Sequence, residues 1–207
     1  MIGLNVISLA KQFGNKKVFS DLSFSATSAV VGIAGRNGSG KTTLMKCIAG
    51  LLKPASGRIE WQIDEKPVNR QAIKHEVGYV APYVELYEEL TVFENLRFVM
   101  DLRNWSLNGS SINDILNRFD AGGLSENYFG SLSTGQRQRI KLAAAIIHQP
   151  RILMLDEPGS NLDRKGKQAV EEMVNQHRNP HSMVLLASNL KDELDLCDQI
   201  IELKPTA

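Results

Sequence analysis

Residues 35–42 read Gly35-Arg36-Asn37-Gly38-Ser39-Gly40-Lys41-Thr42, and this stretch decides the fold. It fits the pattern G-x-x-x-x-G-K-[ST] at every fixed position. A short apolar run at residues 29–34 precedes it and predicts a buried strand. Residues 42–49 follow it and predict a helix that ends at Gly50. A glycine-rich loop in this context predicts a phosphate-binding loop, and the context argues against the alternative of an accidental glycine-rich turn.

The residue types of this loop suit the phosphates of a nucleoside triphosphate. Glycines allow successive backbone N–H groups to point at a phosphate, and the start of the next helix adds free N–H groups and a positive dipole end. Lys41 can reach the β- and γ-phosphate oxygens, and Thr42 offers its hydroxyl to Mg²⁺. The residues that we expect to contact the nucleotide here are Gly35, Asn37, Gly38, Ser39, Gly40, Lys41, Thr42 and Thr43.

An acidic pair forms the second half of the predicted site. Residues 152–155 are apolar, and Asp156 and Glu157 follow them directly. Ligand sites in open α/β sheets lie at the carboxyl ends of the strands, so this pair should face the phosphate loop. We expect Asp156 to hold Mg²⁺ through its water shell and Glu157 to act as general base on the attacking water. The alternative is a strand that ends in a solvated turn, because Asp-Glu-Pro can begin a turn.

The order of the predicted elements indicates an α/β fold: a P-loop NTPase with a mostly parallel sheet core, an antiparallel β edge and an inserted helical subdomain. Strand patterns occur at residues 5–9, 22–25, 29–34, 57–61, 152–155, 183–187 and 200–203. Helical spacing occurs at residues 91–101, 112–119 and 164–176. We therefore expect a single domain over residues 1–207, with a core at 1–84 and 150–207 and the helical subdomain at about 85–149.

One further sequence motif distinguishes between the families of P-loop proteins. Residues 132–139 read Leu132-Ser133-Thr134-Gly135-Gln136-Arg137-Gln138-Arg139. This string resembles the signature, usually written LSGGQ, of the nucleotide-binding domains of ABC transporters. Residues 156–158 and 160–163 resemble that family's extended acidic motif and its D-loop, and residues 18–24 and 196–201 match as well. The resemblance covers essentially the whole chain, and more loosely the chain is similar to the short export-type ATPase subunits of haem exporters.

The resemblance implies an ATPase that binds ATP and Mg²⁺ and works as a head-to-tail pair. The pair would be a homodimer or would include a second ATPase domain, with Ser133, Gly135 and Gln136 of one chain facing the phosphate loop of the other. A simple helix cap at Ser133 is the plainer interpretation, and both can hold at once. The resemblance also implies that Phe13 stacks on adenine, for which a buried core phenylalanine is the alternative.

Three positions depart from the family's pattern. Pro82 stands where the family usually has a glutamine, and it offers no side-chain ligand. Asn189 stands where the family usually has a histidine; it can donate a hydrogen bond to the γ-phosphate but carries no charge. Thr134 replaces a glycine of the signature. Glu157 and Lys41 are kept, so we expect Glu157, Lys41 and Asn189 to serve catalysis, with slow hydrolysis.

Composition bears on location and partners. The net charge is +1, so no overall field draws the chain to nucleic acid, which we do not expect as a partner. No apolar run approaches the ~20 residues that cross a bilayer. We expect a cytoplasmic chain held at the inner face of the cell membrane by a separate transmembrane permease, which docks near residues 82–96. The alternatives are a soluble ABC-type ATPase acting on ribosomes or DNA and an ATP-gated clamp that barely hydrolyses.

Overall fold

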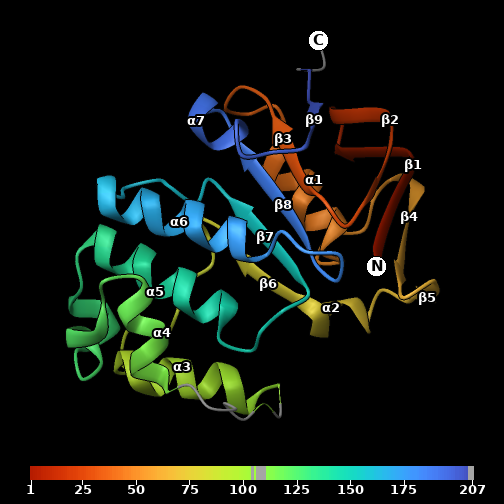
Figure 1. The fold of residues 1–207 in the computed structure, drawn as a ribbon. Coiled ribbons are helices and arrows are strands. Elements are labelled where there is room, and N and C mark those ends of the chain that lie inside the picture. The colour runs from red at the N-terminus through yellow and green to blue at the C-terminus, as the bar shows by residue number, and fades with distance from the viewer. Residues whose placement is uncertain (104, 106–110, 205–207) are drawn as a thin grey trace.

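A computed structural model describes residues 1–103, 105 and 111–204 (Figure 1). Its centre is a five-stranded sheet in the order β6-β7-β8-β3-β9, with parallel pairing between neighbours. The strands are β3 (Val30–Ala34), β6 (Val77–Val80), β7 (Ile152–Asp156), β8 (Met183–Ser188) and β9 (Gln199–Glu202). All residues of β7 and β8 are buried, which explains the apolar runs at residues 152–155 and 183–187. The mostly parallel sheet is confirmed.

A second sheet is antiparallel and forms the predicted β edge. Its strand order is β2-β1-β4-β5, built from β1 (Ile2–Phe13), β2 (Lys16–Thr27), β4 (Ser56–Ile63) and β5 (Lys66–Val68). Buried residues alternate with partly exposed ones at the start of β1, where Ile2, Leu4 and Val6 are buried, as expected for a strand with one face on the core. The strands β1 and β2 are 12 residues each, much longer than the alternation at residues 5–9 and 22–25 predicted. Bulges interrupt their pairing, which breaks the regular alternation on which the prediction relied.

Helices surround the parallel sheet. They are α1 (Lys41–Ile48), α2 (Ile73–Glu76), α3 (Val92–Asp101), α4 (Ile112–Arg118), α5 (Thr134–Ile146), α6 (Arg164–Gln176) and α7 (Lys191–Leu194), with 3-10 turns η1 (Gly122–Leu124) and η2 (Phe129–Ser131). The bounds of α6 agree with the sequence prediction. The region at 85–149 is less helical than expected, because α3 begins only at a capping box of Thr91 and Glu94 and residues 85–90 are irregular.

Two apolar clusters occupy the two faces of the parallel sheet. Leu153 and Leu155 of β7 point to the cluster that includes α3–α6, whereas Ile152 and Met154 point to the cluster that includes α1 and the antiparallel sheet. Figure 1 shows α3–α5 gathered on the side of the molecule opposite β1, β2 and β4. By alternation, Asp156 projects from the same face of β7 as Met154, which is the face that α1 covers.

The boundaries of the helical subdomain, at residues 84 and 150, stay a prediction. One apolar cluster joins Leu96 and Leu116 of this region to Leu153 and Leu186 of the sheet, so the helices share a core with the strands. No helix in the described part of the chain is both long enough and apolar enough to cross a bilayer.

Candidate functional site: a phosphate loop and an acidic strand end

The glycine-rich loop connects β3 to α1 and is shaped by left-handed backbone. Gly38 and Gly40 have φ values of 82° and 101°, a region that favours glycine. A side chain at Gly35 has no room, because its Cβ would lie 2.4 Å from Ser39 Oγ. Gly40 is the N-cap of α1, so the free N–H groups of the first helical turn face the loop. The predicted phosphate loop therefore has the backbone geometry that such a loop needs.

Lys41 lies inside the loop and is only 5% exposed. Its Nζ donates a hydrogen bond of 2.9 Å to the carbonyl of Gly35 and lies 3.6 Å from Oε1 of Glu157. A buried ammonium requires such partners. The structure thus brings together the lysine and the glutamate that the sequence assigned to one site.

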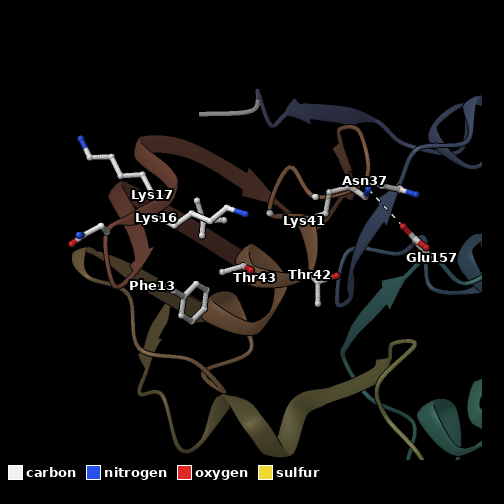
Figure 2. Close-up of a pocket in the computed structure, with 12 residues that line it drawn as sticks. Phe13, Lys16, Lys17, Asn37, Lys41, Thr42, Thr43 and Glu157 are labelled. Atoms are coloured by element: carbon white, nitrogen blue, oxygen red, sulfur yellow. Dashed lines mark ion pairs between the residues drawn. The ribbon is translucent and has the colours of Figure 1, made fainter. Parts of the chain in front are cut away.

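A cavity of about 960 Å³ opens beside the loop (Figure 2). Its lining contains Phe13, Asn37, Gly38, Gly40, Lys41, Thr42, Thr43 and Glu157 from the predicted set. Asn15, Lys16, Lys17 and Val18 complete it. These four come from the β1–β2 hairpin and were missed, because two exposed lysines at the start of a strand are usual on any solvated surface. The additional lysines give the cavity an excess of positive charge, which suits an anionic ligand.

Phe13 lies at the rim of this cavity and is 53% exposed. Such exposure does not fit the alternative of a core phenylalanine. The Nζ of Lys11 lies 4.8 Å from the ring centroid, so one cation already packs on the aromatic surface. Figure 2 shows Phe13 near Thr43, at the end of the cavity away from Glu157. Stacking on adenine remains a prediction for this residue.

Asp156 is a buried carboxylate at the carboxyl end of β7. It is 1% exposed, and neither Oδ1 nor Oδ2 has a hydrogen-bond partner among the described residues. Burial raises the pKa of this carboxyl and the charge of Glu157 raises it further, while the Thr42 hydroxyl, Lys41 and Lys46 oppose the rise. An orphaned carboxylate next to a threonine hydroxyl is the donor set that a hydrated Mg²⁺ takes. These residues therefore fit the metal that the sequence predicted.

Glu157 and Asn189 reach the loop from two neighbouring strand ends. Glu157 has a φ of 51°, and its N–H donates to the carbonyl of Ala187 at 2.8 Å. A left-handed backbone costs a non-glycine residue about 1–3 kcal/mol and is typical of functional positions. Nδ2 of Asn189 donates to Oδ1 of Asn37 at 3.1 Å. Asn189, which stands where the family usually has a histidine, therefore contacts the phosphate loop in the ligand-free structure.

The signature residues lie apart from the phosphate cavity of their own chain. Ser133 is the N-cap of α5 and forms a capping box with Gln136, in which Ser133 N donates to Gln136 Oε1 at 2.9 Å. The simple cap is thus present. Ser133 also lines two smaller cavities, of about 450 and 490 Å³, the second together with Gly135 and Gln136. The first of these includes Pro82 and Glu157, so the signature borders the acidic end of the site.

The segment after Pro82 is bound to α5 by two ion pairs. Lys141 Nζ lies 2.6 Å from Glu85, and Arg137 lies 2.9 Å from Glu88. Lys141 is 8% exposed, so its pair is partly desolvated, which raises the cost of breaking it. These pairs were not predicted, because they join residues about 50 positions apart in segments without a shared periodicity.

Comparison with known proteins agrees with this geometry. The sequence profile described as ABC transporter matches residues 19–160. The chain belongs to the ABC transporter family. It is 32% identical over 205 residues to the sulfate/thiosulfate import ATP-binding protein CysA of Synechococcus elongatus, covering 97% of this chain and 59% of that protein. It is 34% identical over 187 residues to the cytochrome c biogenesis ATP-binding export protein CcmA of Histophilus somni, covering 90% of this chain and 86% of that one.

Solved structures show the same ABC fold. One, titled as the ATP binding subunit of an ABC transporter, is 25% identical, with a TM-score of 0.84 over 98% of this chain and 86% of that chain. A putative ABC transporter ATP-binding protein from Pyrococcus furiosus is 26% identical, with a TM-score of 0.81 over 97% of both chains. The α/β fold with a phosphate loop is confirmed. Because the chain spans about three fifths of CysA, the activity and partners of the whole protein are matters for proposal.

Proposed function

We propose that this chain is the ATP-binding subunit of an ABC transporter and couples MgATP binding and hydrolysis to transport through a separate permease. The observation that carries the proposal is that Lys41 and Glu157 meet at one cationic cavity. The buried carboxylate of Asp156 lies next to Thr42 of the cavity lining. Membership of the ABC transporter family supports the proposal. Among the relatives, CysA is named an import protein and CcmA an export protein. The direction of transport and the cargo therefore stay open.

The ligand-free contacts suggest how the site responds to ATP. Without a ligand, Lys41 forms an ion pair with Glu157 and donates a hydrogen bond to the carbonyl of Gly35. A triphosphate in the loop would compete for Lys41, because phosphate oxygens form strong charge-assisted hydrogen bonds. Glu157 would then be released to accept a proton from the attacking water. Thr42 and Asp156 would hold Mg²⁺, which supplies neutralisation of the phosphate charge.

A second copy or a related domain would complete the site. The N-terminus of α5, with Ser133 and Gly135, offers N–H groups and a positive dipole end to an anion. In this chain Ser133, Gly135 and Gln136 line cavities other than the phosphate cavity. We therefore propose that they meet the γ-phosphate bound to the partner, in a head-to-tail pair.

An exposed aromatic surface marks the proposed contact with the permease. Tyr83, Tyr87, Phe93 and Phe98 are all more than a third exposed, and Tyr87 packs edge-on against Phe98 with centroids 5.3 Å apart. Aromatic residues are enriched at interface centres. We propose that the membrane-spanning partner docks here and thereby holds the chain at the membrane. A photo-crosslinker at Tyr87 should capture a copurified permease, and a crosslinker at Lys66 on β5 should not.

An ATP-gated clamp with little hydrolysis is the second candidate. Two observations favour it: Pro82 has no polar side chain, and Asn189 is neutral and already bonded to Asn37. Both changes weaken the ATP-loaded state more than nucleotide capture, which depends on Lys41, Thr42 and backbone N–H groups. Measured turnover separates the clamp from the ATPase.

A titration of MgATP against the parent and Lys41→Ala tests the proposed function. We expect the parent to bind and the variant to lose tight binding, because the phosphates lose their buried cation. Lys66→Ala is the matched control, since Lys66 is an exposed lysine on the edge strand β5. Equal affinities for the parent and Lys41→Ala would overturn the assignment of the phosphate loop.

A further inference from the structure

Two tyrosines lie on the face of the sheet that carries Asp156. Tyr79 of β6 pairs in register with Met154 of β7, and Asp156 follows Met154 by two residues. Residues two apart in a strand project to the same face, so Tyr79 and Asp156 share the face that α1 covers. Tyr79 also packs against the apolar cluster that contains Met154.

Helix α1 extends over this face and contacts the second tyrosine. Thr42 and Lys46 are four residues apart and therefore lie on the same side of the helix. Thr42 neighbours Asp156, and the Nζ of Lys46 lies 3.5 Å from the ring centroid of Tyr83. A cation this close to a ring face is a favourable contact that fixes the ring on the helix. One side of α1 thus holds both the metal-facing hydroxyl and Tyr83.

The two tyrosines are joined through their hydroxyl groups. The oxygens are 2.7 Å apart, and the rings meet edge-on with centroids separated by 6.2 Å. Two hydroxyls have two protons and four acceptor lone pairs, and one proton and one lone pair are used between them. The pair therefore keeps one donor and three acceptor sites for other partners. Pro82, which lies between the two tyrosines in the sequence, provides no polar side chain of its own.

The charge of the acidic strand end affects the pKa of both tyrosines. Burial raises the pKa of Tyr79 and of Tyr83, and the negative charge of Asp156 contributes to the rise at both. Both side chains therefore stay neutral and keep their protons at physiological pH. A neutral hydroxyl accepts well from a water bound to a divalent cation, because the metal polarises that water into a strong donor.

We infer that the hydroxyl pair of Tyr79 and Tyr83 is part of the magnesium site, where it accepts a hydrogen bond from a metal-bound water beside Asp156 and Thr42. The inference rests on the proposed function, since it presumes that MgATP binds at the phosphate loop. Tyr83 is 42% exposed and belongs to the proposed permease surface, so the pair also connects that surface to the metal.

The test compares nucleotide affinity with and without the metal. Equilibrium titrations with ATP in excess Mg²⁺ and with ATP in EDTA give, for each protein, the gain in affinity due to Mg²⁺. Tyr83→Phe and Tyr79→Phe keep the rings and remove one hydroxyl each. Tyr128→Phe is the control, because Tyr128 is an exposed tyrosine that lines none of the described cavities at the site. Thermal unfolding of each variant verifies folding.

We expect Tyr83→Phe and Tyr79→Phe to reduce the Mg²⁺-dependent gain by about 3- to 10-fold, the usual worth of one hydrogen bond. Affinity for ATP in EDTA should stay at the parent value, and Tyr128→Phe should behave as the parent in both conditions. If Tyr83→Phe retains the full Mg²⁺ gain, or loses affinity equally in EDTA, the inference is wrong while the proposed function stands. If the parent binds no MgATP, both fail.

Discussion

Replacement of Asp156 by asparagine should stabilise the ligand-free protein. The carboxylate is 1% exposed and neither of its oxygens has a hydrogen-bond partner among the described residues. Folding removes it from water, and the Thr42 hydroxyl and two nearby lysines compensate for only part of that cost. An unsatisfied buried polar group costs about 1–3 kcal/mol, and a charged group costs more. Asn keeps the shape but removes the charge, so we expect Asp156→Asn to gain about 1–2 kcal/mol. For a chain of this size that is a rise in Tm of about 2–8 °C.

The pH dependence has a definite sign. The pKa of Asp156 in the folded protein is raised above the ordinary value of an aspartate, chiefly by burial. Between the unfolded and the folded pKa the native state therefore binds more protons, so stability is full below the unfolded pKa and falls as pH rises through the folded pKa. Asp156→Asn should lack this fall.

The assay is thermal unfolding by circular dichroism in EDTA without nucleotide, repeated from acidic to neutral pH. Asp195→Asn is the control, because Asp195 is exposed at the end of α7 and should change Tm little. Addition of MgATP should raise the Tm of the parent more than that of Asp156→Asn, since the metal loses its carboxylate. A variant less stable than the parent in EDTA at neutral pH would refute the reasoning.

Three further outcomes are expected. Glu157→Gln should retain ATP and form a nucleotide-dependent dimer, measured by light scattering; a variant that stays monomeric with MgATP bound would contradict this. Ser133→Arg mixed with Lys41→Ala should recover some ATP-driven pairing, because each heterodimer has one intact composite site, whereas failure of every mixture of folded variants would argue against the head-to-tail pair. Asn189→His should raise turnover, since charge-assisted hydrogen bonds are roughly twice as strong as neutral ones; a further loss with Glu157 intact would show that the site has adapted to asparagine.

The parallel core was predictable because its signals are local. The apolar runs of β7 and β8 are buried on both faces. Helix α6 begins at Arg164, directly after the N-cap Asp163, whose carboxylate accepts from the N–H of Gly166. The phosphate loop and its acidic partner were predictable for the same reason. The short helices α2 and α7 have only four residues each, too few to show helical periodicity, and neither was predicted.

The remaining contacts depend on tertiary structure. Lys16 and Lys17 line the cavity only because the β1–β2 hairpin folds beside the loop. The pairing of Tyr79 with Tyr83 requires β6, the segment that follows it and α1 to meet, and no spacing in the sequence specifies that. The residues that a family motif contains were therefore predicted, whereas residues outside any motif, such as Lys16 and Lys17, were missed.

Phosphate release from MgATP by the parent and by Glu157→Gln tests the central claim most directly. Glu157 is 36% exposed, borders the cavity and lies 3.6 Å from Lys41, so a base at this place reaches both solvent and the phosphate loop. The account predicts measurable turnover by the parent and a rate about 10²–10⁴-fold lower for Glu157→Gln, the usual contribution of a positioned base. Equal rates for the two proteins, or no turnover by a parent that binds MgATP, would contradict it.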